Sequence, residues 1–267
     1  MNHSQEKNHF QYLYGPVSSW RLGISMGIDP LSQKEKNCTF GCVYCQLGER
    51  GVFTDERRVF VPTHAILDEV KRLPKLEIDT FTFSGRGEPT LAKNLGEMIQ
   101  GIRNIRQEKI AVITNSSLIH RVDVQNDLLG ADLVLAKLDA PTQELFNRIN
   151  RQMPQIQLDA ILSGLKQFRK KFTKKLALQI MFIQENQPFA SEMAMLAKTL
   201  QVDEIQINTP LRPSGVRPLG QDDIEAIKKT FQSLCDTRTV ILSVYDVEKK
   251  NVAAVEDGET LRRRGKS

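Results

Sequence analysis

The feature that most constrains the fold of this chain is an alternation of short apolar segments with segments of helical periodicity. Short apolar runs rich in β-branched or aromatic residues are typical of buried strands. Seven such runs occupy residues 22–28, 80–83, 110–114, 133–136, 178–183, 205–207 and 240–245. Repeated strand–helix units predict an α/β fold with a parallel sheet. Six or seven strands predict a partial (β/α)6 barrel, a curved and partly closed relative of the eight-stranded TIM barrel.

Apolar residues at helical spacing lie between most of these strands, and each set forms a stripe that we expect to face the core. The stripes are Ile66, Leu67, Val70 and Leu73; Leu95, Met98, Ile99 and Ile102; Leu158, Ile161, Leu162, Leu165 and Phe168; and Ile224, Ile227, Phe231 and Leu234. The periodicity fades after about residue 250. We therefore predict a core domain over residues 1–250, including a polar N-terminal extension, and a basic, flexible tail over residues 251–267.

The charge balance is mildly basic, with a net charge of +5 and a pI of about 9.0 in 267 residues. Basic residues cluster at 169–175 and 262–266, which indicates either solvated helix ends and a loose tail or attraction to a polyanion such as tRNA. No apolar run approaches the length of a membrane span, and residues 1–9 lack the apolar middle of a signal peptide. We expect a cytoplasmic protein that does not bind a membrane.

Three of the four cysteines lie within eight residues, in the pattern C-x3-C-x2-C formed by Cys38, Cys42 and Cys45. Thiolates are the usual protein ligands of a [4Fe–4S] cluster, and three of them leave one iron open to another ligand. The alternatives are a zinc site, which needs a fourth protein ligand, and three merely buried cysteines. The fourth cysteine, Cys235, follows an amphipathic stretch and is expected to be buried on the last helix.

Polar residues follow several of the apolar runs, where the carboxyl ends of parallel strands gather the chemistry of such folds. The second strand is followed by the run 84–91, Ser-Gly-Arg-Gly-Glu-Pro-Thr-Leu. Turn formation, helix capping and ordinary ion pairs are alternative explanations for these residues. The candidate binding residues at strand ends are Gly85, Gly87, Glu88, Asn115, Lys137, Asp139 and Asn208.

The cysteine pattern, with Tyr44 before its last cysteine, resembles the radical S-adenosylmethionine (SAM) superfamily. This resemblance implies a [4Fe–4S] cluster on Cys38, Cys42 and Cys45, an open iron that binds SAM, and reductive cleavage of SAM to a radical that abstracts hydrogen. It places Tyr44 near the adenine and matches Gly87–Glu88 to an element that receives the SAM amino group. Lys137 or Asp139 would serve the SAM carboxylate, the ribose or the substrate, and Asn208 would contact adenosine or substrate.

A closer resemblance, over residues 14 to about 217, is to the branch that contains wyosine-type tRNA synthases. Two departures limit what it implies. Trp20 replaces a cation of that branch, and no cysteine precedes Cys38, so the second cluster of wyosine synthases has no ligands here. We predict a one-cluster enzyme that takes electrons from a carrier such as flavodoxin or ferredoxin. Its substrate is predicted to be a tRNA nucleoside or a protein; the alternatives are a glycyl-radical enzyme activase and a non-catalytic Fe–S or zinc protein that binds RNA.

Overall fold

The computed structural model describes residues 10–48, 50–246, 254, 260 and 261. Its centre is one eight-stranded sheet in the order β1-β2-β5-β6-β7-β8-β9-β10. The bounds are β1 Leu13–Ser19, β2 Gly23–Ile28, β5 Thr80–Phe83, β6 Lys109–Thr114, β7 Leu133–Lys137, β8 Lys175–Met181, β9 Glu204–Asn208 and β10 Val240–Ser243. All neighbours from β2 to β10 pair in parallel, and only β1 is antiparallel.

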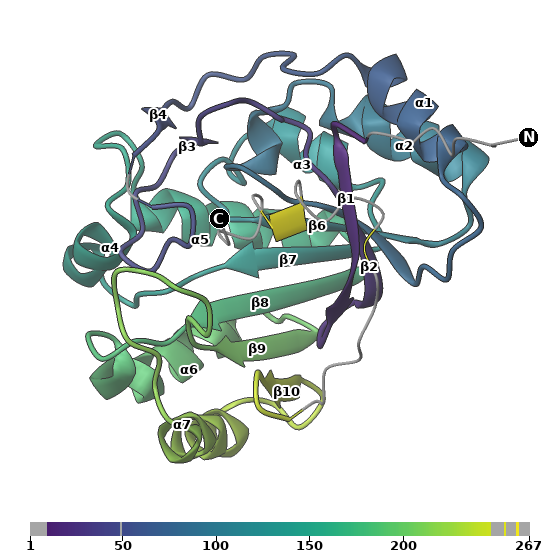
Figure 1. Ribbon diagram of the computed structural model, residues 1–267. Helices are drawn as coiled ribbons and strands as arrows, with labels where there is room; N and C mark the ends of the chain where they lie inside the picture. Colours follow the sequence, from purple (N-terminus) through teal and green to yellow (C-terminus); the bar gives the residue numbers. More distant parts are fainter. Residues whose placement is uncertain (1–9, 49, 247–253, 255–259, 262–267) are drawn as a thin grey trace, which may run out of the picture.

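Helices cover the sheet in the order that the strand–helix alternation predicts (Figure 1). The crossovers contain α1 Thr63–Arg72, α2 Leu95–Ile105, α3 Val122–Leu128, α4 Gln143–Asn150, α5 Leu158–Lys171, α6 Ala190–Thr199 and α7 Gln221–Leu234, with the short 3-10 helices η1 Pro89–Leu91 and η2 Gln187–Phe189. The sheet curls into a partial barrel, so the predicted fold is confirmed. A small second sheet pairs β3 Asn37–Cys38 with β4 Val52–Phe53.

The predicted helix stripes form the core between helices and sheet. In α2, Leu95, Met98, Ile99 and Ile102 are all buried. In α5 the buried members are Leu158, Ile161, Leu165 and Phe168, and in α7 they are Ile224, Ile227 and Phe231. Burial of these side chains, at about 25 cal/mol per Å² of apolar surface, fixes each helix on the sheet.

The structure contains β1, which was not predicted, and it changes the bounds of other strands: β8 ends at Met181 where residue 183 was predicted, and β10 ends at Ser243 where residue 245 was predicted. The sequence did not predict β1, because Gly15 and Pro16 interrupt its apolar pattern and their peptide bond is cis. A Pro is tolerated on an edge strand because one of its sides carries no sheet partner, and β1 is the edge. The strand β8 begins at Lys175, three residues earlier than predicted, because Lys175–Ala177 pair with β7.

Most of the predicted tail lies outside the described residues, as do residues 1–9 of the predicted extension. Of residues 251–267, the structure describes 254, 260 and 261. The Thr260 hydroxyl is buried and accepts a hydrogen bond from Gly15 N at 2.9 Å. The boundary at residue 250 remains a prediction. Among the described helices, none is long and apolar enough to cross a membrane.

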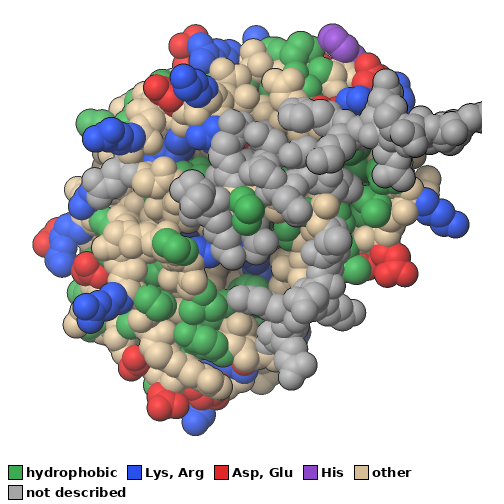
Figure 2. Space-filling model, in the orientation of Figure 1, with side chains coloured by type: hydrophobic (Ala, Val, Ile, Leu, Met, Phe, Trp, Pro, Cys, Tyr) green, Lys and Arg blue, Asp and Glu red, His purple; other side chains and the backbone are tan. Residues whose placement is uncertain are grey.

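Charged side chains of both signs are interspersed around the face drawn in Figure 2. The predicted basic cluster at 169–175 follows the same pattern, because most of its cations have partners. Arg169 pairs with Asp203, Lys174 with Asp132 and Lys175 with Glu204. Lys171 donates to the Gln125 side chain at 3.0 Å. Carboxylates therefore pair with three of the five cations in this run, which weakens its attraction for a polyanion and favours the explanation as ordinary helix ends.

Candidate functional site

The cysteine loop, residues 38–45, is held at the carboxyl ends of the strands by backbone hydrogen bonds from two directions. The end of α4 accepts from it, through Val43 N to Ile149 O at 2.9 Å and Gly41 N to Asn150 O at 3.0 Å. The loop after β5 also binds its start, because Glu88 N donates to Asn37 O at 3.0 Å. These contacts fix the loop between β5 and α4.

Each of the three cysteine sulfurs has a nitrogen donor beside it. Asn115 Nδ2 lies 3.6 Å from Cys38 Sγ, Asn150 Nδ2 lies 3.4 Å from Cys42 Sγ, and Lys36 Nζ lies 3.9 Å from Cys45 Sγ. Hydrogen bonds to sulfur stabilise negative charge on a thiolate and tune the metal that it binds. A set of three thiols with one donor each is therefore suited to a charged metal cluster.

Burial raises the pKa of two of these thiols, Cys38 and Cys42. Burial raises the pKa of Cys38 to about 12, and the nearby Glu88 carboxylate acts in the same direction. Burial also raises the pKa of Cys42, although Lys137 acts against it. Metal ligation requires the thiolate. Without a metal, the Cys38 and Cys42 thiols are protonated at neutral pH, and these protons must leave when a metal binds.

No three His, Cys, Asp or Glu side chains among the described residues converge on a single-ion position. The three thiolates of a [4Fe–4S] cluster bind three different irons, so they need not share one centre. Three thiols in one loop, each with a donor, fit the protein half of such a cluster.

Glu88 joins the cysteine loop to the sheet. Its carboxylate is buried and accepts from Thr114 Oγ1 at 2.6 Å, Thr90 Oγ1 at 2.7 Å and Asn115 N at 2.7 Å. Burial raises the pKa of Glu88, and these hydrogen bonds oppose that rise. Asn115 therefore connects Glu88 to the cysteine loop, because its backbone N–H donates to the Glu88 carboxylate and its side chain lies beside Cys38 Sγ.

Gly85 and Gly87 have φ values of +138° and +145°, which L side chains rarely adopt. A Cβ on Gly87 would lie 1.7 Å from Asn37 O, and one on Gly85 would lie 2.4 Å from the Asp29 carboxyl carbon. Glycine at position 87 thus lets this loop pack against Asn37, directly before the cysteine loop, and glycine at position 85 lets it pack against Asp29.

Tyr44 belongs to a second buried network, on the Cys42 side. Its hydroxyl donates to Asp139 Oδ2 and accepts from Lys137 Nζ at 2.8 Å and from Asn150 Nδ2 at 3.1 Å. Lys137 Nζ also lies 4.3 Å from the centroid of the Tyr44 ring. Burial, followed by the Asp139 charge, raises the pKa of Tyr44 well above its ordinary value, so the phenol remains a neutral donor.

Asp139 is almost completely buried and is held at both oxygens. Oδ2 also accepts from Asn150 Nδ2 at 2.8 Å, and Oδ1 accepts from Met181 N at 2.8 Å. Asn186 donates to Asp139 O at 2.8 Å, which gives Asn186 a structural role. The structure thus places the predicted residues Tyr44, Lys137 and Asp139 in one hydrogen-bonded cluster.

Asn208 lies at the carboxyl end of β9, as expected. Its Oδ1 accepts from Thr209 N at 2.9 Å, and its backbone oxygen accepts from Phe182 N at 2.7 Å. These contacts do not connect it to the cysteine loop. Arg212 makes that connection from the same region, because its Nη1 donates to Gln46 Oε1 at 2.6 Å.

Asn150 and Lys36 were not predicted as site residues. Asn150 ends α4, and its contact with Cys42 spans 108 positions; only the packing of α4 on the cysteine loop brings the two together. Lys36 could have been found from the sequence, because it is a cation two residues before the first cysteine of the motif. Cys235 is partly buried at the end of α7 and donates to Ala194 O at 3.6 Å, which agrees with a structural role.

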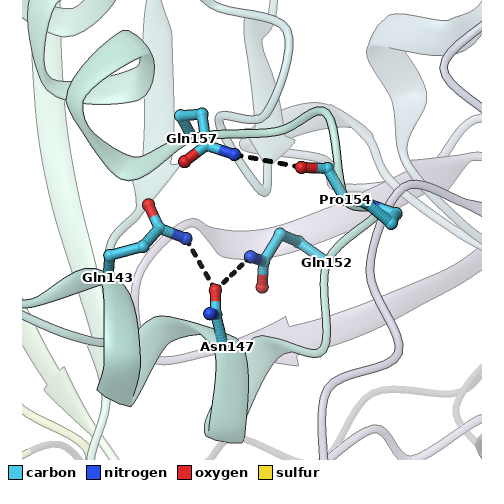
Figure 3. Close-up of a pocket in the computed structure, with 5 residues that line it drawn as sticks. All are labelled: Gln143, Asn147, Gln152, Pro154 and Gln157. Carbon is cyan, nitrogen blue, oxygen red and sulfur yellow. Dashed lines mark hydrogen bonds between the residues drawn. The ribbon is translucent and has the colours of Figure 1, made fainter.

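A hollow of about 370 Å³ lies between α4 and the segment that follows it, lined by Gln143, Asn147, Gln152, Pro154 and Gln157 (Figure 3). Its amides mostly bond one another: Gln143 and Gln152 both donate to Asn147 Oδ1, and Gln157 donates to Pro154 O at 3.0 Å. No titratable side chain lines it.

Residues 36–200 match the family model of the radical SAM superfamily, and the chain belongs to that superfamily. A UPF0026 protein of Synechocystis sp. is 41% identical over 209 residues, which are 78% of each chain. A UPF0026 protein of Methanocaldococcus jannaschii is 38% identical over 223 residues, 81% of this chain and 68% of the relative.

Solved structures agree in fold. The crystal structure of Streptococcus suis SuiB bound to precursor peptide SuiA has a TM-score of 0.62 at 13% identity. The match covers 80% of this chain and 48% of SuiB, so this chain spans about half the length of that protein. The chain is a radical SAM enzyme with a partial-barrel fold, and its cofactors are a [4Fe–4S] cluster and SAM.

Proposed function

We propose that Cys38, Cys42 and Cys45 hold the [4Fe–4S] cluster and leave its fourth iron to SAM. The observation that carries this proposal is the set of nitrogen donors, one beside each sulfur. When bound, the reduced cluster supplies the electron that cleaves SAM to a radical able to abstract hydrogen from a substrate.

We infer that the loop after β5 receives the amino group of SAM. Carbonyl oxygens suit an ammonium group, and the backbone at Gly85 and at Gly87 can approach a ligand closely because these two residues carry no Cβ. The Glu88 carboxylate already accepts bonds from Thr90, Thr114 and Asn115. Glu88 therefore acts chiefly by holding this loop and Asn115 in position, which refines the direct contact expected from the sequence.

Tyr44 is proposed to lie against the adenosine half of SAM. Lys137 and Asp139 restrain its hydroxyl, so the ring is held in one orientation beside Cys42. Lys137 supplies the positive charge of this hydrogen-bonded group of side chains. Its ammonium is suited to the SAM carboxylate or the ribose oxygens. Asn208, at the carboxyl end of β9 and two strands along the sheet from β7, is proposed to contact adenosine or substrate.

The substrate is proposed to carry an anionic group. Burial, followed by repulsion from Arg212, lowers the pKa of the Arg21 guanidinium to about 10. Arg21 and Arg212 are neighbouring, partly buried cations, and such a pair favours a ligand with carboxylate or phosphate oxygens. This property agrees with the predicted tRNA nucleoside, which remains a prediction.

Anaerobic reconstitution with iron and sulfide, followed by dithionite and SAM, tests this function. We expect 5′-deoxyadenosine from the wild-type protein and from Cys235→Ser, and none from Cys42→Ala. Full SAM cleavage by Cys42→Ala, or a purified anaerobic protein that holds zinc and no iron, would contradict the assignment. Deuterium transfer into 5′-deoxyadenosine from labelled RNA or protein extracts then identifies the substrate class.

A further inference from the structure

A second hollow, of about 540 Å³, opens on the surface beside the cysteine loop. Its lining is mainly cationic and apolar, with Glu35 as the one carboxylate among the described residues that line it. We call six of its residues the Lys34 patch: Lys34, Lys36, Arg50, Arg86, Leu47 and Phe53. Phe53 of this patch belongs to β4. In Figure 1, β4 lies beside β3 on the side toward which the β7 arrow points, so the patch lies at the carboxyl end of the parallel strands, where the cysteine loop is.

The Lys34 patch reaches a cluster ligand through one side chain. Lys36 is buried, donates to Gly48 O at 2.7 Å and places its Nζ 3.9 Å from Cys45 Sγ. The same Nζ lies 5.6 Å from the centroid of the Phe53 ring. A surface molecule that touches Phe53 is therefore separated from the Cys45 sulfur by little more than the Lys36 side chain.

Phe53 is exposed although it is aromatic. Its relative exposure is 44%, and that of the neighbouring Val52 is 43%. The other side of the ring rests on the cysteine loop, because a Cβ on Gly41 would lie 3.2 Å from it. Exposed aromatic residues surrounded by polar or charged ones are typical of protein interfaces.

We propose that the Lys34 patch docks an acidic protein that delivers single electrons to the cluster. Lys34, Arg50 and Arg86 attract its negative surface, and Phe53 makes the apolar contact at the centre. One electron leaves the carrier, which is oxidised, and enters the cluster, which is reduced. Transfer over such a contact is fast because electron tunnelling weakens steeply with distance. Electron-transfer complexes are small and transient, and opposite charges raise their association rates.

The same patch could bind RNA, since cations hold phosphates and an exposed aromatic ring stacks on bases. The short path from the Phe53 ring past Lys36 Nζ to the Cys45 sulfur favours the electron carrier, because the rate of electron transfer falls steeply with distance from the cluster. RNA binding is therefore kept as an outcome that the experiment detects.

This inference rests on the proposed cluster site, and the choice of reductant separates the two. Cluster reduction is followed by absorbance in an anaerobic stopped-flow instrument, with either dithionite or a reduced flavodoxin of acidic pI. In Lys34→Glu/Arg50→Glu we expect reduction by flavodoxin to slow by about tenfold or more at low salt, while reduction by dithionite is unchanged. The matched control is Lys170→Glu/Lys229→Glu, which makes the same charge change at exposed positions on α5 and α7 and should keep the wild-type rate.

The wild-type protein provides a test that needs no variant. Its rate with flavodoxin should fall as salt shortens the Debye length from about 30 Å at 0.01 M to about 8 Å at 0.15 M. A salt-independent rate, or a wild-type rate in Lys34→Glu/Arg50→Glu, overturns the proposal. So does a double variant that loses retention of RNA while its flavodoxin rate is unchanged. Absence of any cluster that dithionite reduces in the wild-type protein contradicts the proposed function itself.

Discussion

The side-chain nitrogen of Asn150 lies 3.4 Å from the sulfur of Cys42 and also donates to the Asp139 carboxylate. The hydrogen bond to sulfur stabilises the extra negative charge of a reduced cluster. We therefore expect Asn150→Ala to make the reduction potential of the cluster more negative, as measured by a redox titration followed by electron paramagnetic resonance. Asn147→Ala, an exposed asparagine on the same helix, should leave the potential unchanged; equal potentials in all three proteins would contradict this role.

Tyr44→Phe removes the hydroxyl shared by Lys137, Asp139 and Asn150. Because the Asp139 carboxylate then loses a donor in a buried site, we expect the free energy of unfolding to fall by about 1–3 kcal/mol. Urea unfolding of the cluster-free protein measures the change. Tyr245→Phe loses one bond, to Leu219 O at 3.0 Å in a partly buried place, and should cost about 0.5–1.5 kcal/mol. An effect of Tyr44→Phe no larger than that of the control would rule out a cooperative network.

Gly87→Ala should abolish SAM cleavage and lower the free energy of unfolding by more than about 3 kcal/mol, because strain at φ +145° adds to a collision with Asn37 O. Gly48→Ala is the matched control. Gly48 also has a positive φ, +78°, but nothing lies within 4 Å of its added Cβ. Its expected loss is about 1–2 kcal/mol, with SAM cleavage retained. Comparison of the two variants separates the cost of a positive φ, which both share, from the cost of the collision with Asn37 O, which only Gly87→Ala makes.

The raised pKa values of Cys38 and Cys42 predict how cluster assembly depends on pH. A raised pKa means that the thiols are protonated at pH 7, so the reactive thiolate fraction grows as pH rises toward the pKa of Cys38, about 12. We expect anaerobic reconstitution to accelerate from pH 7 to pH 9 and to release protons, because only the thiolate binds iron. Iron–sulfur absorbance measures the rate of reconstitution, and a pH-stat titration measures the protons released. Cys235→Ser should behave like the wild-type protein; a rate independent of pH would show that the thiols are already ionised.

The parts of the site that lie close in sequence could be predicted without a structure. Cys38, Cys42 and Cys45 share one loop, and the strand that ends at Phe83 leads directly into Gly85–Glu88. The parallel sheet was also predictable. Each helix that connects two successive strands must bury its apolar stripe against a face of the sheet, and this arrangement makes the strands parallel. The edge strand β1 was missed because Gly15 and Pro16 break its pattern, while pairing with β2 decides its conformation.

The sequence by itself indicated the candidate thiol ligands, the glycine positions and the succession of strands and helices from β2 onward, since spacing and periodicity express them locally. Only the tertiary structure decided which donor reaches which sulfur. Asn150 resembles an ordinary helix-end residue until α4 packs on the cysteine loop. The basic run 169–175 likewise resembles a polyanion site until Asp203, Asp132 and Glu204 pair with it. Hydrogen bonds and ion pairs act over a few ångströms in space, and the sequence does not record which distant residues the fold brings within that range.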